Sequence, residues 1–146
     1  MITYRPATEA DLPLVTDQVI ALTMQYKDAF KTPCFDLTVE TVKDNILAFI
    51  EDYIIVLRDG QTVAFCLLGD EFGLTHLEEL IVLPQYRNQG IGSEVVKTIM
   101  PQCTMALMVT VLTANTGAVR FFERLGFQKC FNNGLSSMDM VRNPQK

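Results

Sequence analysis

The sequence has no apolar run long enough to cross a membrane. A transmembrane helix needs roughly 20 predominantly apolar residues, and the best candidate, Met105 to Leu112, is far shorter. No signal peptide is recognisable either, because Arg5, Glu9 and Asp11 interrupt the N-terminus before an apolar segment can build. We therefore expect a cytoplasmic protein that does not use a membrane as its partner.

Basic residues are too few for a nucleic-acid-binding surface. The 146 residues include 12 Lys and Arg against 17 Asp and Glu, a formal net charge of −5. Nucleic-acid binders carry the opposite charge balance, so we expect no nucleic-acid partner. The same negative balance favours a cationic partner such as an amine.

The four cysteines are not arranged as metal ligands. Cys34, Cys66, Cys103 and Cys130 include no Cys-x-x-Cys pair, and His76 is the sole histidine. Zinc sites use closely spaced Cys and His. We therefore predict no metal site and free, reduced thiols.

The composition indicates one globular domain spanning residues 1–146. Hydrophobic residues make up 49% and charged residues 20%, and a chain of this length buries enough surface for a proper core. Apolar periodicity and turn residues predict an α/β (α+β) fold with the element order βααβββαβαββ. The predicted strands are 2–5, 53–57, 62–68, 76–83, 105–112, 127–131 and 135–141.

Helical spacing of apolar residues predicts the inward faces of the helices. The stripes are Leu12, Val15, Val19, Leu22 and Tyr26; Val39, Val42, Ile46 and Phe49; and Ile91, Val95, Val96 and Ile99. A further short helix follows residue 115. Because the run 105–112 is nearly all apolar, we expect a strand covered on both faces.

Local motifs predict where elements begin and end. Thr8-x-x-Asp11 fits a capping box that starts the first helix, and Thr38 caps the second. Asp59-Gly60 favours a two-residue hairpin turn, Gly126 a left-handed helix end, and residues 69–73 a loop. A closing hairpin turns at Asn132-Asn133-Gly134.

Residues 87–92, Arg-Asn-Gln-Gly-Ile-Gly, lie between a predicted strand and a predicted helix. The first amides of a helix lack intrahelical partners and carry partial positive charge, so phosphate oxygens bind there. Gly90 and Gly92 let the backbone approach a phosphate closely, and Arg87 adds a fork of donors. A turn that merely starts a helix fits the same residues, so the surrounding motifs must decide.

Further motifs follow in a fixed order. After the helix come an apolar strand, Asn115, and a helix with Phe121-Phe122-x-x-Leu125-Gly126-Phe127, while the chain opens with Tyr4-Arg5-Pro6-Ala7-Thr8-x-x-Asp11. This set resembles the GNAT superfamily of acetyl-CoA-dependent N-acetyltransferases over almost the whole chain. Residues 77–82, 86–87 and 91–94 are locally similar to diamine and polyamine acetyltransferases, which does not fix a substrate.

The resemblance implies a central, mostly antiparallel mixed sheet of about seven strands with about four helices. The strand ending at Pro84 and the strand 105–112 would splay apart and hold acetyl-CoA as the acyl donor. Backbone groups of Ile81 and Val82 would pair with its pantetheine arm, and Asn115 and Phe122 would contact it. The pyrophosphate would be held by Arg87, Asn88, Gln89, Gly90, Ile91, Gly92 and Ser93. Many relatives have glycine in place of Asn88, which is tolerable if Asn88 keeps an ordinary backbone conformation.

The same resemblance implies direct attack of an amine on the thioester, with a backbone N–H near Val82 stabilising the oxyanion. Because a free alkylamine is mostly protonated near neutral pH, a base must remove a proton. Glu78 is the first candidate, with Glu79 and His76 as alternatives. Without a bulge, alternation along the strand would point Glu78 and Glu79 to opposite faces.

One position departs from the family pattern. Many relatives place a tyrosine at the second aromatic of the pair, where its hydroxyl can protonate the departing thiolate, whereas this chain has Phe122. Tyr26 and Tyr53 are alternative acids in principle, and structural roles fit both better. Three possibilities remain open: an N-acetyltransferase acting on a primary amine, a non-catalytic acyl-CoA-binding module, or an unrelated α/β binding domain. Homodimers are common among similar proteins.

Overall fold

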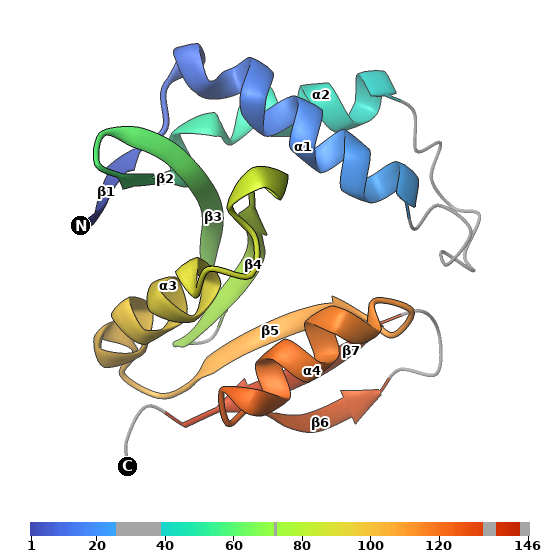
Figure 1. Ribbon diagram of the computed structural model, residues 1–146. Coiled ribbons are helices and arrows are strands. Elements are labelled where there is room, and N and C mark those ends of the chain that lie inside the picture. The colour runs from blue at the N-terminus through green and yellow to red at the C-terminus, as the bar shows by residue number, and fades with distance from the viewer. Residues whose placement is uncertain (26–38, 72, 133–136, 144–146) are drawn as a thin grey trace.

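The computed structural model describes residues 1–25, 39–71, 73–132 and 137–143, which form one sheet with helices on both of its faces (Figure 1). The strands are β1 (Ile2–Pro6), β2 (Tyr53–Arg58), β3 (Gln61–Glu71), β4 (Leu74–Val82), β5 (Leu107–Leu112), β6 (Gln128–Asn132) and β7 (Ser137–Arg142). The α-helices are α1 (Leu12–Gln25), α2 (Val39–Ala48), α3 (Ile91–Ile99) and α4 (Thr116–Arg124). The predicted element order is confirmed.

The strands are arranged in the order β1-β2-β3-β4-β5-β7-β6. Among the described strands, β4 and β5 form the one parallel pair, and every other neighbouring pair is antiparallel. A parallel pair needs a crossover connection, and α3 supplies it between β4 and β5. The predicted mixed, mostly antiparallel sheet is therefore confirmed.

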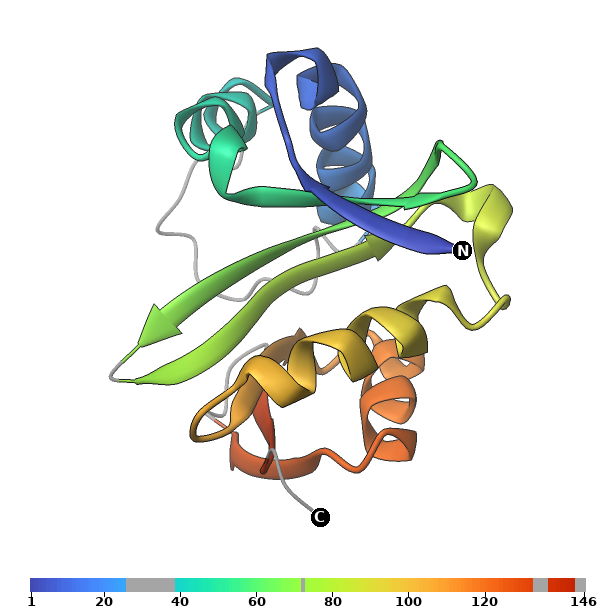
Figure 2. The same cartoon turned by 90° about the vertical axis from the view of Figure 1, so that its left-hand side faces the viewer.

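Each face of the sheet has its own apolar core. Tyr53, Ile55, Phe65 and Ile81 pack with α1 and α2 in one cluster. The residues between them in the strands point the other way and pack with α3, α4 and β5 in the second cluster. In the view of Figure 2 the long β3–β4 hairpin runs between the α1 and α2 layer and the α3 and α4 layer.

The strands β4 and β5 pair over only part of their length. Their register covers Thr75↔Leu107, His76↔Met108 and Leu77↔Val109, while β4 continues to Val82 and β5 to Leu112. Beyond the last pair the two strands diverge, as Figure 1 shows. We use "apex" for the position of the Leu77↔Val109 pair, where the divergence begins.

A bulge lies at the apex. The β3–β4 register passes from Leu67↔Glu79 to Leu68↔Leu77, so Glu78 is an extra residue in β4. A bulge shifts the alternation of the strand by one residue. Consequently Leu77 and Leu80, three residues apart, both pack in the core cluster of α3 and α4.

Several local predictions are confirmed. Thr8 and Asp11 form the capping box, at a short 3-10 turn (residues 9–11) that runs into α1. Asp59 and Gly60 both have positive φ, 53° and 83°, as a two-residue hairpin turn requires. Gly126 ends α4, with the Phe127 N–H donating to the Phe122 carbonyl at 3.0 Å. The stripe of α3 is buried as predicted.

Three predictions are wrong. Residues 69–71 are not a loop, because they pair with His76, Thr75 and Leu74 and extend β3. Phe49 is 56% exposed, and the core position at the end of α2 is taken by Ile50. Strand β5 is fully buried on one face only: its odd-numbered residues are buried, whereas on the other face Met108 and Leu112 are half-buried and Thr110 is exposed. Tyr26, Cys34, Thr38 and Asn133-Gly134 lie outside the described residues.

Candidate active site

A cavity of about 1010 Å³ lies where β4 and β5 diverge. It is bounded by the C-terminal half of α1, the end of β4, the turn into α3, and α4. Its lining residues from the predicted site are Ile81, Val82, Arg87, Asn88, Gly90, Ile91, Gly92, Ser93, Asn115 and Phe122. The fold therefore brings together residues that are up to 41 positions apart in the sequence.

The turn into α3 has the geometry of an anion site. Gly90 is the residue preceding the helix, with φ of 80°, and a Cβ there would meet no atom within 4 Å. Glycine is needed for conformation here, since other residues adopt positive φ at a cost. The Glu94 N–H donates to the Gly90 carbonyl at 3.1 Å, so the amides of residues 91–93 precede the first donor of the helix.

Asn88 does not keep an ordinary backbone conformation. Its φ is 63°, in the left-handed region. The condition set from the sequence is thus not met, and the residue is tolerated for another reason: asparagine adopts this conformation more readily than other residues with a side chain. We call the turn of residues 87–93 the cradle. It contains two left-handed residues, Asn88 and Gly90.

Gly92 is needed for a different reason, which is space. A Cβ at this position would lie 3.0 Å from the Phe121 Cζ and 3.8 Å from a Val82 methyl. The ring of Phe121 thus packs directly on the backbone of α3. This contact joins α3 to α4, and Phe121 also packs edge to face on Phe122, with ring centroids 4.9 Å apart.

Two guanidinium groups border the cavity. The Arg87 Nε donates to the Val82 carbonyl at 3.0 Å, which holds the side chain beside the cavity. The two terminal nitrogens of Arg87 take no part in this hydrogen bond. Arg124, in the last turn of α4, lines the same cavity. Both favour an anionic ligand.

The edge of β4 that faces the cavity is not paired with β5 beyond Leu77, and on this edge the Val82 carbonyl accepts from Arg87 Nε. The Leu83 N–H donates to the Val63 carbonyl on β3 at 2.9 Å. Because backbone groups alternate sides along a strand, Ile81 also faces β3, whereas Leu80 and Val82 face the space that β5 has left. An extended ligand can pair with these groups as an added strand.

The bulge brings two carboxylates to one face. Gly69 on β3 pairs with His76 on β4. A Cβ added at Gly69 would point to the α1 side of the sheet and would lie 2.6 Å from Glu78 Oε2. Glu79 lies on the same side, where Tyr53 OH donates to Glu79 Oε2 at 2.5 Å. The prediction of opposite faces for Glu78 and Glu79 holds only for a regular strand, and the bulge overturns it.

The environments of these two carboxylates differ. Glu78 is exposed. Burial raises the pKa of Glu79, the bond from Tyr53 opposes that rise, and the charge of Glu78 adds to it. Burial, followed by the charge of Glu79, raises the pKa of the Tyr53 hydroxyl above its ordinary value. Tyr53 is thus a structural donor to Glu79, in line with the role preferred from the sequence.

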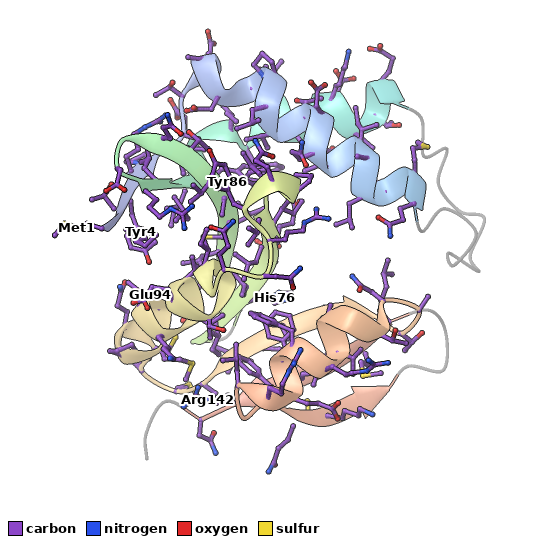
Figure 3. All side chains as sticks on the ribbon, viewed as in Figure 1. Met1, Tyr4, His76, Tyr86, Glu94 and Arg142 are labelled. Carbon is purple, nitrogen blue, oxygen red and sulfur yellow. The ribbon has the colours of Figure 1, made fainter. Side chains whose placement is uncertain are left out.

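His76 takes part in a chain of side chains across three strands. Its Nε2 lies 3.1 Å from Thr110 Oγ1 on β5, and Thr110 Oγ1 donates to Asp139 Oδ1 on β7 at 2.8 Å. The other ring nitrogen, Nδ1, is buried and has no hydrogen-bond partner among the described residues. Figure 3 labels His76 near the middle of the molecule, away from Met1 and Tyr4 at its edge.

Asn115 and Phe122 have structural contacts as well as positions in the cavity wall. Asn115 Oδ1 accepts from the Ala118 N–H at 3.1 Å, which caps α4. Phe122 is buried and packs edge to face on Phe121 and Phe127. No hydroxyl is present at this position of the wall.

Sequence reasoning missed one wall of the cavity and included four residues that do not line it, namely Gln89 and the three candidate bases Glu78, Glu79 and His76. The missed wall is the inner side of α1, formed by Gln18, Ala21, Leu22 and Gln25. Leu22 was predicted to face inward, and its stripe was the available signal. Gln89 does not line the cavity, and its side chain donates to the Gln85 carbonyl at 3.3 Å. Glu78 lies outside the lining too.

Two kinds of feature are absent from the part of the chain that the structure describes. Within these residues, no helix has the length and apolar character needed to cross a membrane. In the same part of the chain, no group of three or more His, Cys, Asp or Glu side chains is placed to hold a metal ion.

Comparison with known proteins gives a family and a set of similar folds. A family model described as Acetyltransferase (GNAT) family matches residues 19–127. No curated protein matches the chain. An acetyltransferase from Thermus thermophilus has a similar structure, with a TM-score of 0.77 at 18% identity over 98% of this chain and 97% of that one.

Two similar structures contain coenzyme A. The PaiA N-acetyltransferase of Thermoplasma acidophilum, in complex with coenzyme A, has a TM-score of 0.74 at 17% identity, covering 98% of this chain and 99% of that one. The N-acetylglutamate synthase of Neisseria gonorrhoeae, complexed with coenzyme A and N-acetyl-glutamate, has a TM-score of 0.74 at 19% identity. This chain matches over 100% of its own length and 36% of that chain. At these identities the likeness is one of fold.

Proposed function

The chain belongs to the GNAT acetyltransferase family, and from this premise we propose that it transfers an acetyl group from acetyl-CoA to a primary amine of a small molecule or peptide. The observation that carries the proposal is the divergence of β4 and β5 with an anion cradle at its open end. One cavity thus contains a phosphate site and, beside it, the edge of β4 that β5 leaves unpaired.

Acetyl-CoA is the acyl donor. Its pyrophosphate binds the cradle from Arg87 to Ser93, where helix amides and the Arg87 guanidinium meet it. We call the space between the diverging strands β4 and β5 the groove. The pantetheine arm lies along β4 in this groove as an added strand, and it pairs with the groove-facing backbone groups of Leu80 and Val82. Ile81, Asn115 and Phe122 contribute to the wall around it.

The reactive carbonyl lies at the inner end of this arm. The amides of Leu80 and Val82 both face the groove, so either can donate to the developing oxyanion. A strand rises roughly 3.3 Å per residue, which puts Val82 about 13 Å from Glu78 along β4 and Leu80 about half as far. Leu80 therefore supplies the oxyanion donor nearer the base, and Val82 pairs with the arm.

The amine approaches from the face that carries Glu78. This is the α1 side of the sheet, opposite the face covered by α3 and α4. Glu78 takes a proton from the alkylammonium, directly or through one water, so that the neutral amine can attack the thioester. With Glu79 and Asp139 on the same face, the negative charge there favours a cationic acceptor.

A second function is favoured by one observation, the absence of a hydroxyl at Phe122. A chain of this fold without an acid for the departing thiolate could bind acyl-CoA without catalysis. A thiolate is itself a tolerable leaving group, since thiol pKa values lie near 8.5. The transferase proposal therefore stands ahead of this alternative.

Thiol release from acetyl-CoA across a panel of diamines, polyamines, amino acids and peptides tests the proposal, with binding measured in parallel by calorimetry. Release that depends on the amine supports it. Tight binding of acetyl-CoA without turnover on any amine would favour the binding module. Absence of binding at millimolar acetyl-CoA would reject both functions.

A further inference from the structure

The hydrogen bonds around His76 determine which ring nitrogen carries the proton. Thr110 has one hydroxyl proton, and Asp139, which accepts at 2.8 Å, takes it. Thr110 Oγ1 can then only accept from His76, so Nε2 carries a hydrogen and donates across 3.1 Å. In the neutral imidazole, Nδ1 is then the nitrogen without a hydrogen, and it has a free lone pair.

The lone pair of Nδ1 is unusual, because a histidine with a purely structural role would have no reason to leave it without a partner. Nδ1 is buried, and no residue in the part of the chain that the structure describes forms a hydrogen bond with it. Leaving such a group unsatisfied costs free energy, and buried polar atoms in folded proteins nearly always have partners.

The position of His76 gives the lone pair a use. His76 belongs to the last paired positions of β4 and β5, one residue before the apex. Thr110 is the residue after the apex on β5. The His76–Thr110 bond thus joins the two strands next to the apex, on the face that also carries Glu78, whereas the cavity lining of β4 begins at Leu80.

The chemistry of the transfer leaves one proton without an assigned carrier. A neutral amine that adds to the thioester becomes a cationic nitrogen in the tetrahedral intermediate. This nitrogen must lose a proton while the sulfur gains one. Glu78 has already taken the first proton from the ammonium, and Phe122 has no hydroxyl with which to protonate the sulfur.

We propose that His76 carries this second proton. The step rests on the transferase function proposed above. As the C–N bond forms and the C–S bond breaks, Nδ1 accepts the proton from the amine nitrogen through a chain of waters, because this nitrogen is buried and His76 does not line the cavity, and it returns the proton by the same route to the departing sulfur. The imidazolium formed in between is stabilised by Asp139 through Thr110, which makes Thr110 and Asp139 positioning residues.

The first test uses the fact that His76 is the sole histidine, so its ring nitrogens give the only imidazole signals in a ¹⁵N NMR spectrum. Under mildly alkaline conditions we expect the tautomer with hydrogen on Nε2. We also expect the Nδ1 signal to shift when CoA and an acceptor amine are both added. Hydrogen on Nδ1 in the free protein, or an Nδ1 signal unmoved by the ternary complex, would overturn the proposal.

The second test separates catalysis from structure by kinetics. His76→Gln keeps a donor for Thr110 and removes the proton carrier, so kcat should fall about 100-fold or more while the KM for acetyl-CoA stays within a few-fold. Thr110→Val and Asp139→Asn should each lower kcat by less than His76→Gln does. Thr110→Ser, which keeps the hydroxyl, should have the wild-type kcat. Tyr4→Phe, which removes a hydroxyl bonded to Thr98 on the outer side of α3, is the control and should match the wild type.

The outcomes distinguish this inference from the function on which it rests. If the wild type releases thiol and His76→Gln has unchanged kcat, His76 is not the carrier although the transferase function stands. If Thr110→Ser fails to restore kcat although it folds with the wild-type melting temperature, the relay through Thr110 is wrong. If the wild type binds acetyl-CoA and turns over no amine, both proposals fail together.

Discussion

At the scale of single residues, Asn88 is held in a conformation that few side chains tolerate. Its φ of 63° in the cradle turn costs an ordinary L-residue roughly 1 to 2 kcal/mol. Asn88→Gly should therefore bind acetyl-CoA as well as the wild type, and Asn88→Ala should bind it about 5- to 10-fold more weakly. Calorimetric titration measures both. Equal affinity of Asn88→Ala and Asn88→Gly would show that the turn conformation does not matter for binding.

Substitution of Glu78 tests its assignment as the base. Glu78→Gln removes the proton acceptor and leaves the cavity lining intact, so kcat should fall about 100-fold with little change in the dissociation constant of acetyl-CoA. Steady-state kinetics and calorimetry on the same preparation separate the two effects. Glu51→Gln, at an exposed carboxylate remote from the cavity lining, is the control. An unchanged rate for Glu78→Gln would remove Glu78 as the base.

The residue scale also shows where sequence reasoning stops. Alternation predicts opposite faces for Glu78 and Glu79, and the bulge brings both to the α1 side. No residue type in 77–80 marks the bulge, because it arises from register with β3, which is a property of two strands. The candidate base was thus identified from the sequence, whereas its neighbourhood was not.

At the scale of elements, the contact between α3 and α4 depends on Gly92. Gly92→Ala would place a Cβ 3.0 Å from the Phe121 ring, which must displace the ring or the helix and distort the cradle. We expect acetyl-CoA affinity to fall about 10-fold. Phe121→Leu in the same chain should recover part of the loss by making room, measured as a coupling between the two substitutions. Purely additive losses would contradict the steric explanation.

The start of α1 depends on a carboxylate that is 8% exposed, Asp11. It accepts from both Arg5 terminal nitrogens, at 2.8 and 2.9 Å, and from the Thr8 N–H at 2.9 Å. The Arg5 hydrogen bond is the main cause that lowers the pKa of Asp11 below its ordinary value of 3.8. Its stabilising effect is therefore present above that ordinary value and is lost as the pH falls through the folded-state pKa.

Asp11→Asn should consequently lower the free energy of unfolding by about 1 to 2 kcal/mol at neutral pH, and the difference from the wild type should shrink below about pH 4. Urea denaturation across a pH series measures it. Asp59→Asn is the matched comparison, since the ion pair of Asp59 with the N-terminal amine is almost fully exposed and should contribute little. A pH-independent loss for Asp11→Asn would contradict the charge explanation.

At the scale of the whole molecule, the two core clusters share one sheet and one residue, Tyr86, which packs against both. We therefore predict that residues 1–146 unfold in a single cooperative transition. Acetyl-CoA at about 100 times its dissociation constant should add about 2.7 kcal/mol, which raises the melting temperature of a chain of this size by about 5 to 10 °C. Two transitions in calorimetry, of which the ligand shifts one, would contradict a single domain.

The sequence by itself determined the elements and the turn that precedes α3. Periodicity, turn residues and caps are local properties, so the strand order along the chain, the Asp59-Gly60 turn and the cradle before α3 could be predicted from neighbouring residues. The tertiary structure decided what depends on register and distance. The divergence of β4 from β5, the bulge at Glu78 and the bond from His76 to Thr110 join segments 34 positions apart or arise between strands. Such pairings follow from how whole faces pack, and no local pattern encodes them.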